Sequence, residues 1–288
     1  MRFSKFRSVV NSNHLTLVKR AVIHNLGWPD VAEDRKRIVD YPGLIFLFSL
    51  FVLWLATHVG ASLRKLRTLK DSEREVFGVV EVATLTLLGL IVGFSFSMAI
   101  SRYNLRKTYE EAEATAIGTE YLRAGLLPAA DAAGVRGLLR KYLDLRVAFY
   151  QTSNERALQQ INADTAQLQA KMWSAVQASA EARPTPVVAL AVSGMNDVLN
   201  SQGNTQAAWW NRIPIAAWGL MTATAICCNL LVGYSVRGSG RERAAILLVL
   251  PLVVSISFFL IADIDSPLSG LIQVAPQNLV SLSRSLPK

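Results

Sequence analysis

The residues best placed for chemistry in this sequence are charged groups within or beside long apolar segments. Glu81 lies inside an apolar run, Arg102 follows the end of that run, and Asp263 and Asp265 follow the last apolar run of the chain. Charged side chains at membrane depth are costly, and they usually face a cavity, a pore or a partner. These four residues are therefore the first candidates for a functional role.

Glu81 has two interpretations. It lies about a turn and a half inside its run, so its carboxylate can reach the membrane interface and pair with Arg64, Lys65 or Arg243. Alternatively, it stands at the mouth of a pore, with a role linked to ions or protons.

The two aspartates also have two interpretations. Asp263 and Asp265 can form structural ion pairs with Arg102, which would fix the ends of two membrane helices. They can also contribute to a cation site, because carboxylates together with backbone carbonyls suit calcium. Because two acidic residues alone are a weak signal for a cation site, we favour the ion pairs.

No motif of an enzyme or a metal site is present. The sequence lacks a nucleophile elbow, a phosphate-binding loop, a zinc-protease motif and a dinucleotide-binding glycine pattern. His14, His24 and His58 have no Cys or His partner at metal-ligand spacing, and Cys227 and Cys228 are adjacent packing residues. The sequence therefore predicts no enzyme, no cofactor and no bound metal.

Four apolar runs position these groups. The chain has 288 residues, of which 51% are hydrophobic, and its mean hydropathy is +0.30. About 20 helical residues cross a hydrocarbon core of ~30 Å. Four runs satisfy that length, so we predict an all-α membrane protein with spans at Gly43–Leu63, Val76–Ser101, Pro214–Val236 and Ala244–Ala262.

The second run continues without a proline into a polar helical pattern that ends near Leu127–Pro128. This pattern predicts one continuous helix that leaves the membrane and enters a soluble domain. Hydroxyl groups within the run can bond the backbone carbonyl one turn back, so individually they indicate little. They are Thr84, Thr86, Ser95, Ser97 and Ser101.

The segment between the second and third spans is predicted to be an elongated helical domain. Apolar residues recur at helical spacing from about Asp131 to Glu181, either as one continuous helix or with an interruption near Thr152–Asn154. A third helix is expected over Val187–Asn200. The expected organisation is a basic amphipathic tail (1–41), spans one and two (42–101), the helical domain (102–212), spans three and four (213–262) and a C-terminal tail (263–288).

The formal net charge of +9 fits attraction to anionic lipids better than binding to nucleic acid in a chain with four spans. Basic residues are concentrated in the hairpin loops Arg64–Glu75 and Arg237–Arg243. By the positive-inside rule both hairpins face the cytoplasm, which would place the helical domain on the other side.

The residues Gly93–Phe94–Ser95–Phe96–Ser97–Met98–Ala99–Ile100–Ser101–Arg102–Tyr103 resemble the second membrane helix of bestrophins. In that family a Gly-Phe pair, an apolar run and an Arg followed by an aromatic residue end the pore-lining span. Leu138–Arg146 resembles a bestrophin helix outside the membrane. More closely, the chain is similar to a bacterial family of bestrophin-like membrane proteins from Leu44 to its end. That similarity is carried by Glu111–Ala112, Ala116–Thr119, Tyr121–Arg123, Leu126–Pro128 and Asp263–Gly270.

The resemblance implies a pentameric channel, mostly for anions such as chloride, whose second helices line the pore. It implies that Phe94 narrows the pore and that Thr86, Leu90 and Ser97 share its stripe, where Thr86 and Leu90 replace larger apolar groups of the family. It also implies that the helical domain lies in the cytosol, whereas the basic residues of the hairpin loops place that domain on the other side of the membrane. Bestrophins carry an acidic calcium-binding cluster after span four, and only Asp263 and Asp265 stand there in this chain.

Two hypotheses follow. The first is an oligomeric ion channel in the bacterial inner membrane, with Glu81 at one mouth and Thr86, Leu90, Phe94 and Ser97 along the pore. The second is a non-conducting scaffold or sensor whose helical domain binds a partner, in which Gly89 and Gly93 form a small-xxx-small contact with a neighbouring helix.

Overall fold

The computed structural model describes residues 41–66, 71–236, 241–267 and 270–287. Almost all of the predicted basic N-terminal tail and the middle of both hairpin loops lie outside these residues. Within the described ranges every regular element is a helix, which confirms the predicted all-α fold.

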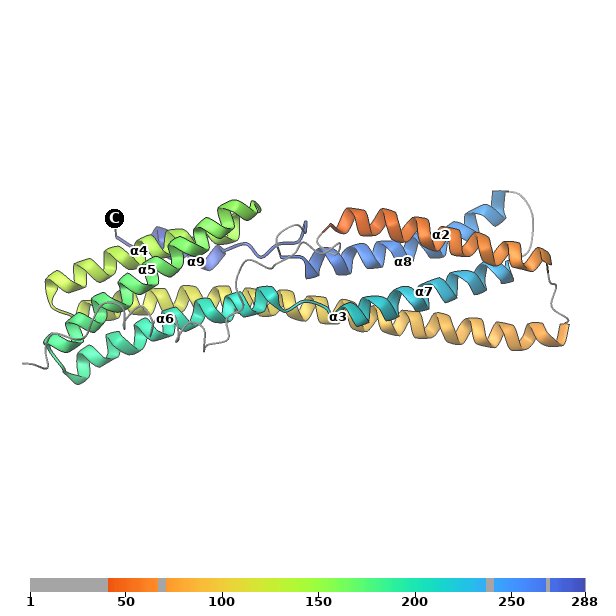
Figure 1. Cartoon of the computed structure of the whole chain (residues 1–288). Coiled ribbons are helices and arrows are strands. Elements are labelled where there is room, and N and C mark those ends of the chain that lie inside the picture. Colours follow the sequence, from red (N-terminus) through yellow and green to blue (C-terminus); the bar gives the residue numbers. More distant parts are fainter. Residues whose placement is uncertain (1–40, 67–70, 237–240, 268–269, 288) are drawn as a thin grey trace, which may run out of the picture. The chain divides into compact units, whose positions relative to one another are not determined.

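In the described part of the chain four helices are long and apolar enough to cross a membrane, as predicted. They are α2 (Pro42–Leu66), the first half of α3 (Asp71–Arg123), α7 (Ile215–Ser235) and α8 (Arg241–Asp265). Helix α2 packs against α7 and α8, and α3 packs against the same two helices (Figure 1). Pro251 lies inside α8, where neighbouring helices make the loss of one backbone hydrogen bond tolerable.

Two glycines bring α2 and α7 into backbone contact. A Cβ added at Gly60 would lie 2.1 Å from the carbonyl oxygen of Leu230, and one added at Gly233 would lie 2.0 Å from that of Thr57. The Thr57 hydroxyl also donates to the side-chain oxygen of Asn229 at 3.1 Å. Small residues that permit close approach are typical of helix pairs in membranes.

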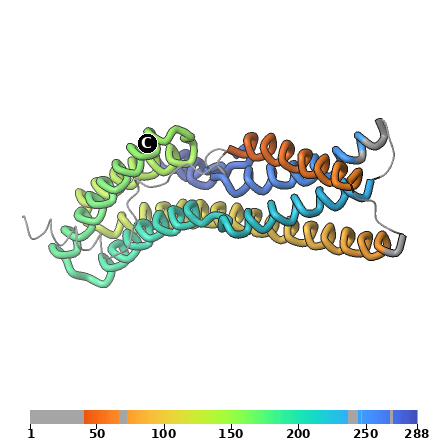
Figure 2. Tube along the Cα trace, turned by 45° about the vertical axis from the view of Figure 1, so that its right-hand side comes forward, coloured from red at the N-terminus to blue at the C-terminus, as the bar shows by residue number. Residues whose placement is uncertain are grey.

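Helix α3 is a single helix of 53 residues, about 80 Å long at 1.5 Å per residue. It contains no proline, and Pro128 follows its last turn and the 3₁₀ turn Ala124–Leu126. The predicted continuous helix is therefore present. Figure 2 shows α3 running beside the membrane helices along one half and beside the remaining helices along the other.

The outer bundle consists of the second half of α3 with α4 (Ala129–Gln151), α5 (Glu155–Ala182), α6 (Pro186–Trp210) and α9 (Gln277–Ser285). The break between α4 and α5 lies at Thr152–Asn154, so of the two predicted alternatives the interrupted helix is the one present. Asn154 caps α5 by accepting from the N–H groups of Arg156 and Ala157. Thr185 caps α6 in the same way, with Pro186 at its first position.

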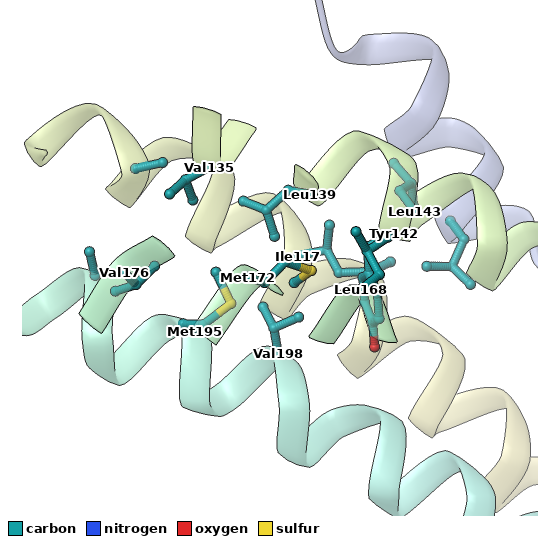
Figure 3. Packing of buried hydrophobic residues seen from close by; sticks show 14 of the residues in the cluster. Ile117, Val135, Leu139, Tyr142, Leu143, Leu168, Met172, Val176, Met195 and Val198 are labelled. Atoms are coloured by element: carbon teal, nitrogen blue, oxygen red, sulfur yellow. The ribbon is translucent and has the colours of Figure 1, made fainter. Parts of the chain in front are cut away.

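The core of the outer bundle joins its four long helices (Figure 3). Ile117 of α3, Leu139 and Tyr142 of α4, Met172 of α5 and Met195 of α6 are all fully buried. Complete burial of such side chains contributes about 1.5–3 kcal/mol each. The outer bundle therefore has a hydrophobic core of its own.

One predicted helix end was wrong, and one helix was not predicted. Helix α6 continues ten residues beyond the predicted end at Asn200, through Ser201, Thr205 and Trp209, which are buried against the rest of the bundle. The predicted C-terminal tail contains α9, whose Leu279 is fully buried. In both cases packing stabilises segments whose composition favours helix only weakly.

Candidate functional site

The membrane half of α3 (residues 76–101) is packed on one narrow face only. Leu88, Ser95 and Ala99 are buried against the other membrane helices. Only 6% of the most apolar 18-residue stretch of α3 is buried, against 33% in α2 and 50% in α8. Span two is thus the membrane helix with the least cover from its own chain.

The four predicted pore-lining residues all lie on the uncovered face. We call Thr86, Leu90, Phe94 and Ser97 the span-two stripe. All four are exposed, with Phe94 at 70% and Leu90 at 53%. The Thr86 hydroxyl donates to the carbonyl of Val82 at 2.9 Å, the backward bond expected from the sequence. The structure brings these residues together on one side of one helix.

Glu81 is half-buried at the hairpin end of the same helix. Its carboxylate accepts a hydrogen bond from the Ser235 hydroxyl, at the end of α7. Arg64, one of its predicted partners, instead donates to the carbonyl of Val236. Glu81 therefore joins span two to span three at this end of the bundle.

The junction between the membrane helices and the outer bundle is polar and buried. Arg102 lies 3.8 Å from the carboxylate of Asp265, which also accepts the N–H of Ile213 at 3.1 Å. Asp263 has a different role from the one predicted, because it accepts the N–H groups of Leu271 at 2.6 Å and Ile272 at 3.0 Å. The two aspartates are thus engaged by backbone and arginine donors.

Sequence reasoning missed Arg106 at this junction. Its guanidinium donates to the carbonyls of Ile264 at 3.1 Å, Asp265 at 3.0 Å and Ala208 at 3.4 Å. It thereby joins α3, α6 and α8 in one buried network. The available signal was its position one helical turn after Arg102.

Sequence reasoning also missed the buried carboxylates of the outer half of α3 (residues 102–123). Glu113 forms a fully buried ion pair with Arg146 and accepts the Thr205 hydroxyl at 3.1 Å. Glu110 accepts the N–H of Leu279 at 2.9 Å and the amide of Asn278 at 2.7 Å, which fixes α9. These contacts hold the outer bundle together.

Glu120 is the exception among these carboxylates, because neither of its buried oxygens has a hydrogen-bond partner among the residues that the structure describes. Gly194 leaves room for it, since a Cβ there would lie 2.0 Å from the Glu120 carboxylate and 2.8 Å from the guanidinium of Arg123. Burial raises the pKa of Glu120 to about 8, with Arg123 opposing the rise and Asp197 adding to it. Arg123 itself lies 3.7 Å from Asp197.

Among the described residues no group of three or more His, Cys, Asp or Glu side chains is arranged to hold a metal ion. The exposed stripe on span two and the buried polar junction are the two candidate functional features. The first offers an uncovered apolar and hydroxyl-bearing surface, and the second holds that surface in place.

The Bestrophin-like domain model matches residues 43–279, from α2 into α9. The chain belongs to the Bestrophin-like family. A crystal structure of a bacterial bestrophin homolog from Klebsiella pneumoniae superposes with a TM-score of 0.58 at 14% identity, over 84% of this chain and 99% of that chain. No curated protein sequence matches the chain.

Two single-mutant structures of a bacterial bestrophin homolog from the same organism give TM-scores of 0.56 and 0.55, at 13% and 14% identity. Each covers 83% of this chain and 99% of that chain. At this level of identity the superposition shows a shared fold. As a Bestrophin-like protein with four apolar membrane helices, the chain is an integral membrane protein.

Proposed function

We propose that this Bestrophin-like protein is a homo-oligomeric ion channel in which span two lines the pathway. The observation that carries the proposal is the uncovered face of span two. A membrane helix whose own chain covers so little of it must meet lipid, water or further copies. Thr86 and Ser97 lie at the two ends of that face with Leu90 and Phe94 between them, and hydroxyl groups suit contact with water better than contact with lipid.

Family membership supports the same arrangement. It favours a pentamer that conducts anions, chloride among them, in the inner membrane of a bacterium. In this proposal Phe94 is the widest side chain on the stripe and narrows the pathway, while Glu81 lies near one mouth. Arg102, Arg106 and Asp265 hold the far end of span two against α8.

The test compares two phenylalanines that are equally exposed in the protomer, Phe94 at 70% and Phe48 at 69%. Purified protein is reconstituted in planar bilayers, and single-channel conductance is measured for the wild type, Phe94→Ala and Phe48→Ala. Phe94→Ala is expected to raise conductance because it widens the pathway, and Phe48→Ala is expected to leave it unchanged because Phe48 faces lipid. Absence of current from both the wild type and Phe94→Ala would contradict the channel proposal.

Reversal potentials under a chloride gradient test the proposed anion selectivity. Thiol accessibility supplies an independent measurement, in a background with Cys227 and Cys228 replaced by serine. A cysteine at position 94 should react with a water-soluble reagent from the aqueous phase, whereas one at position 48 should not.

The scaffold hypothesis is supported by a different observation. A Cβ added at Gly89 or at Gly93 would meet no atom within 4 Å, so both glycines are open on the surface of the protomer. In a non-conducting scaffold a second helix would pack on them and cover Phe94. A cysteine at position 94 would then be unreactive towards the water-soluble reagent.

A further inference from the structure

A groove runs along the surface between α3 and α6, which lie side by side in the outer bundle (Figure 1). We call it the α3–α6 groove, and its volume is about 490 Å³. Its charged lining consists of two exposed carboxylates, those of Glu111 and Asp197, and the guanidinium of Arg123. Two negative groups and one positive group leave a net negative charge, which attracts cations.

The charged groups lie at the two ends of the α3–α6 groove. Glu111 and Arg123 are twelve residues apart on α3, which corresponds to about 18 Å along the helix axis. Arg123 lies 3.7 Å from Asp197, so Asp197 belongs to the end away from Glu111. A single metal ion or a compact ammonium group cannot contact carboxylates at both ends. The lining between the ends consists of small side chains: Ala112, Thr115, Ala116 and Thr119.

A third carboxylate lies directly behind the end that holds Asp197. Glu120 is completely buried, and neither of its oxygens has a hydrogen-bond partner in the described part of the chain. It lies against Gly194, which lines the groove, because a Cβ at Gly194 would stand 2.0 Å from Oε2 of Glu120. The same Cβ would stand 2.8 Å from Nη1 of Arg123. Arg123 therefore lies between two carboxylates, Asp197 on the surface and Glu120 beneath it.

We propose that the α3–α6 groove binds a linear aliphatic polyamine, with one terminal ammonium group at Glu111 and the other at Asp197. The terminal N–H groups donate to the two carboxylates, and the methylene groups lie along the small side chains between them. Alanine methyl groups suit contact with methylene groups, and threonine hydroxyls can accept from a secondary ammonium group.

The same binding event gives the buried carboxylate a partner. When an ammonium group pairs with Asp197, the guanidinium of Arg123 is released from that ion pair and turns to Glu120. It then supplies the charge-assisted hydrogen bonds that the Glu120 oxygens lack. Glu120 is thereby stabilised in its ionised form when the ligand is bound. This inference concerns a ligand of the outer bundle and is independent of whether the protein conducts ions.

The test is isothermal titration calorimetry of the purified full-length protein in an uncharged detergent, with spermidine as the probe. Tris(2-aminoethyl)amine is the matched ligand, because it carries the same number of ammonium groups in a compact, branched shape that cannot reach both ends. Spermidine is expected to bind at least about tenfold more tightly, since it engages two carboxylates at once. Equal affinities for the two amines, or no binding of spermidine, would overturn the proposal.

Neutral variants locate the binding site. Glu111→Gln and Asp197→Asn each remove the charge at one end, and each should weaken spermidine binding by about three- to fivefold, as expected for an exposed ion pair. Asp144→Asn is the matched control, because Asp144 is an exposed carboxylate of α4 that does not line the groove. All three side chains are exposed, so the variants should fold, and circular dichroism checks this. Unchanged binding in both groove variants would place the amine elsewhere, for example on copurified anionic lipid, and would contradict the site.

Proton release supplies a second readout. Burial raises the pKa of Glu120 to about 8, so its carboxyl group is mostly protonated at pH 7 in the free protein. Binding heats measured at pH 7 in two buffers of different ionisation enthalpy give the number of protons released. The wild type should release protons when Arg123 turns to Glu120, whereas Glu120→Gln should bind spermidine and release fewer. Equal proton release by the two proteins would overturn the exchange of Arg123 between the carboxylates.

Discussion

The two halves of α3 belong to one uninterrupted helix, yet only the outer half buries charged side chains. The membrane half buries Leu88, Ser95 and Ala99, whereas the outer half buries Arg106, Glu110 and Glu113 beside Ile117. Both halves expose apolar and hydroxyl-bearing side chains, and the outer half also exposes Lys107 and Glu111. The helix thus changes the chemistry of its packed face at the membrane boundary.

This difference shows which contacts hold each half. In the membrane half close packing of small and apolar residues is enough, since every backbone group is already bonded within a helix. In the outer half water competes for every polar group, and the buried charges are stabilised only by their particular partners. The exposed face of the membrane half is the surface along which we propose that ions pass.

Breaking the buried ion pair of the outer half should give the largest effect. Arg146→Met leaves Glu113 charged and buried with only Thr205 as a partner, which should cost about 3–5 kcal/mol of unfolding free energy. Chemical unfolding followed by circular dichroism measures the loss, with exposed Lys141→Met as the control. The double variant Arg146→Met with Glu113→Leu should recover most of the stability. A small loss in the single variant would contradict a role for this pair in holding α3 to α4.

Glycine substitutions should separate the packed and free surfaces of the membrane helices. Gly60→Ala or Gly233→Ala forces a Cβ against backbone and should cost about 2–3 kcal/mol. Gly89→Ala and Gly93→Ala meet open space in the protomer, so its stability should stay the same or rise by up to about 1 kcal/mol. Thermal unfolding in detergent compares the four variants. Equal losses at all four positions would show that Gly89 and Gly93 are packed in the assembled protein, as the scaffold hypothesis requires.

Glu120 should make the stability of the outer half depend on pH. Its pKa is raised to about 8 in the folded protein, above about 4.3 in an unfolded chain. Between these values the folded state binds the extra proton, so stability should be greatest at the acidic end and fall as pH rises towards 8.

Replacing Glu120 with glutamine removes that titration. Glu120→Gln should be more stable than the wild type at pH 9 by about 1–2 kcal/mol, because it no longer buries an unpaired charge, and nearly equal to it at pH 5. The midpoint of thermal unfolding across pH measures the difference, and Asp164→Gln, on the exterior of α5, is the control. A wild type and a Glu120→Gln variant with parallel pH profiles would show that Glu120 finds a partner when ionised.

Much of the fold follows from local patterns in the sequence. Apolar length identified four spans, the absence of proline identified the continuous α3, and Thr152–Asn154 marked the break between α4 and α5. The ends of α6 and the existence of α9 did not follow, because Ser201, Thr205 and Leu279 are helical through contacts with residues distant in sequence. Helix periodicity also placed Thr86, Leu90, Phe94 and Ser97 on one face.

The partners of the charged residues could not be predicted from local patterns in the sequence. The sequence by itself determined that α3 is long, that its first half is apolar and that acidic residues recur along its second half, since these properties depend on neighbours in the chain. Only the tertiary structure decided that Glu113 pairs with Arg146, that Asp263 caps a loop and that Glu120 lacks a hydrogen-bond partner among the described residues. A charge is stabilised or left unpaired by groups brought within a few ångströms of it, and folding brings those groups from helices far apart in the chain.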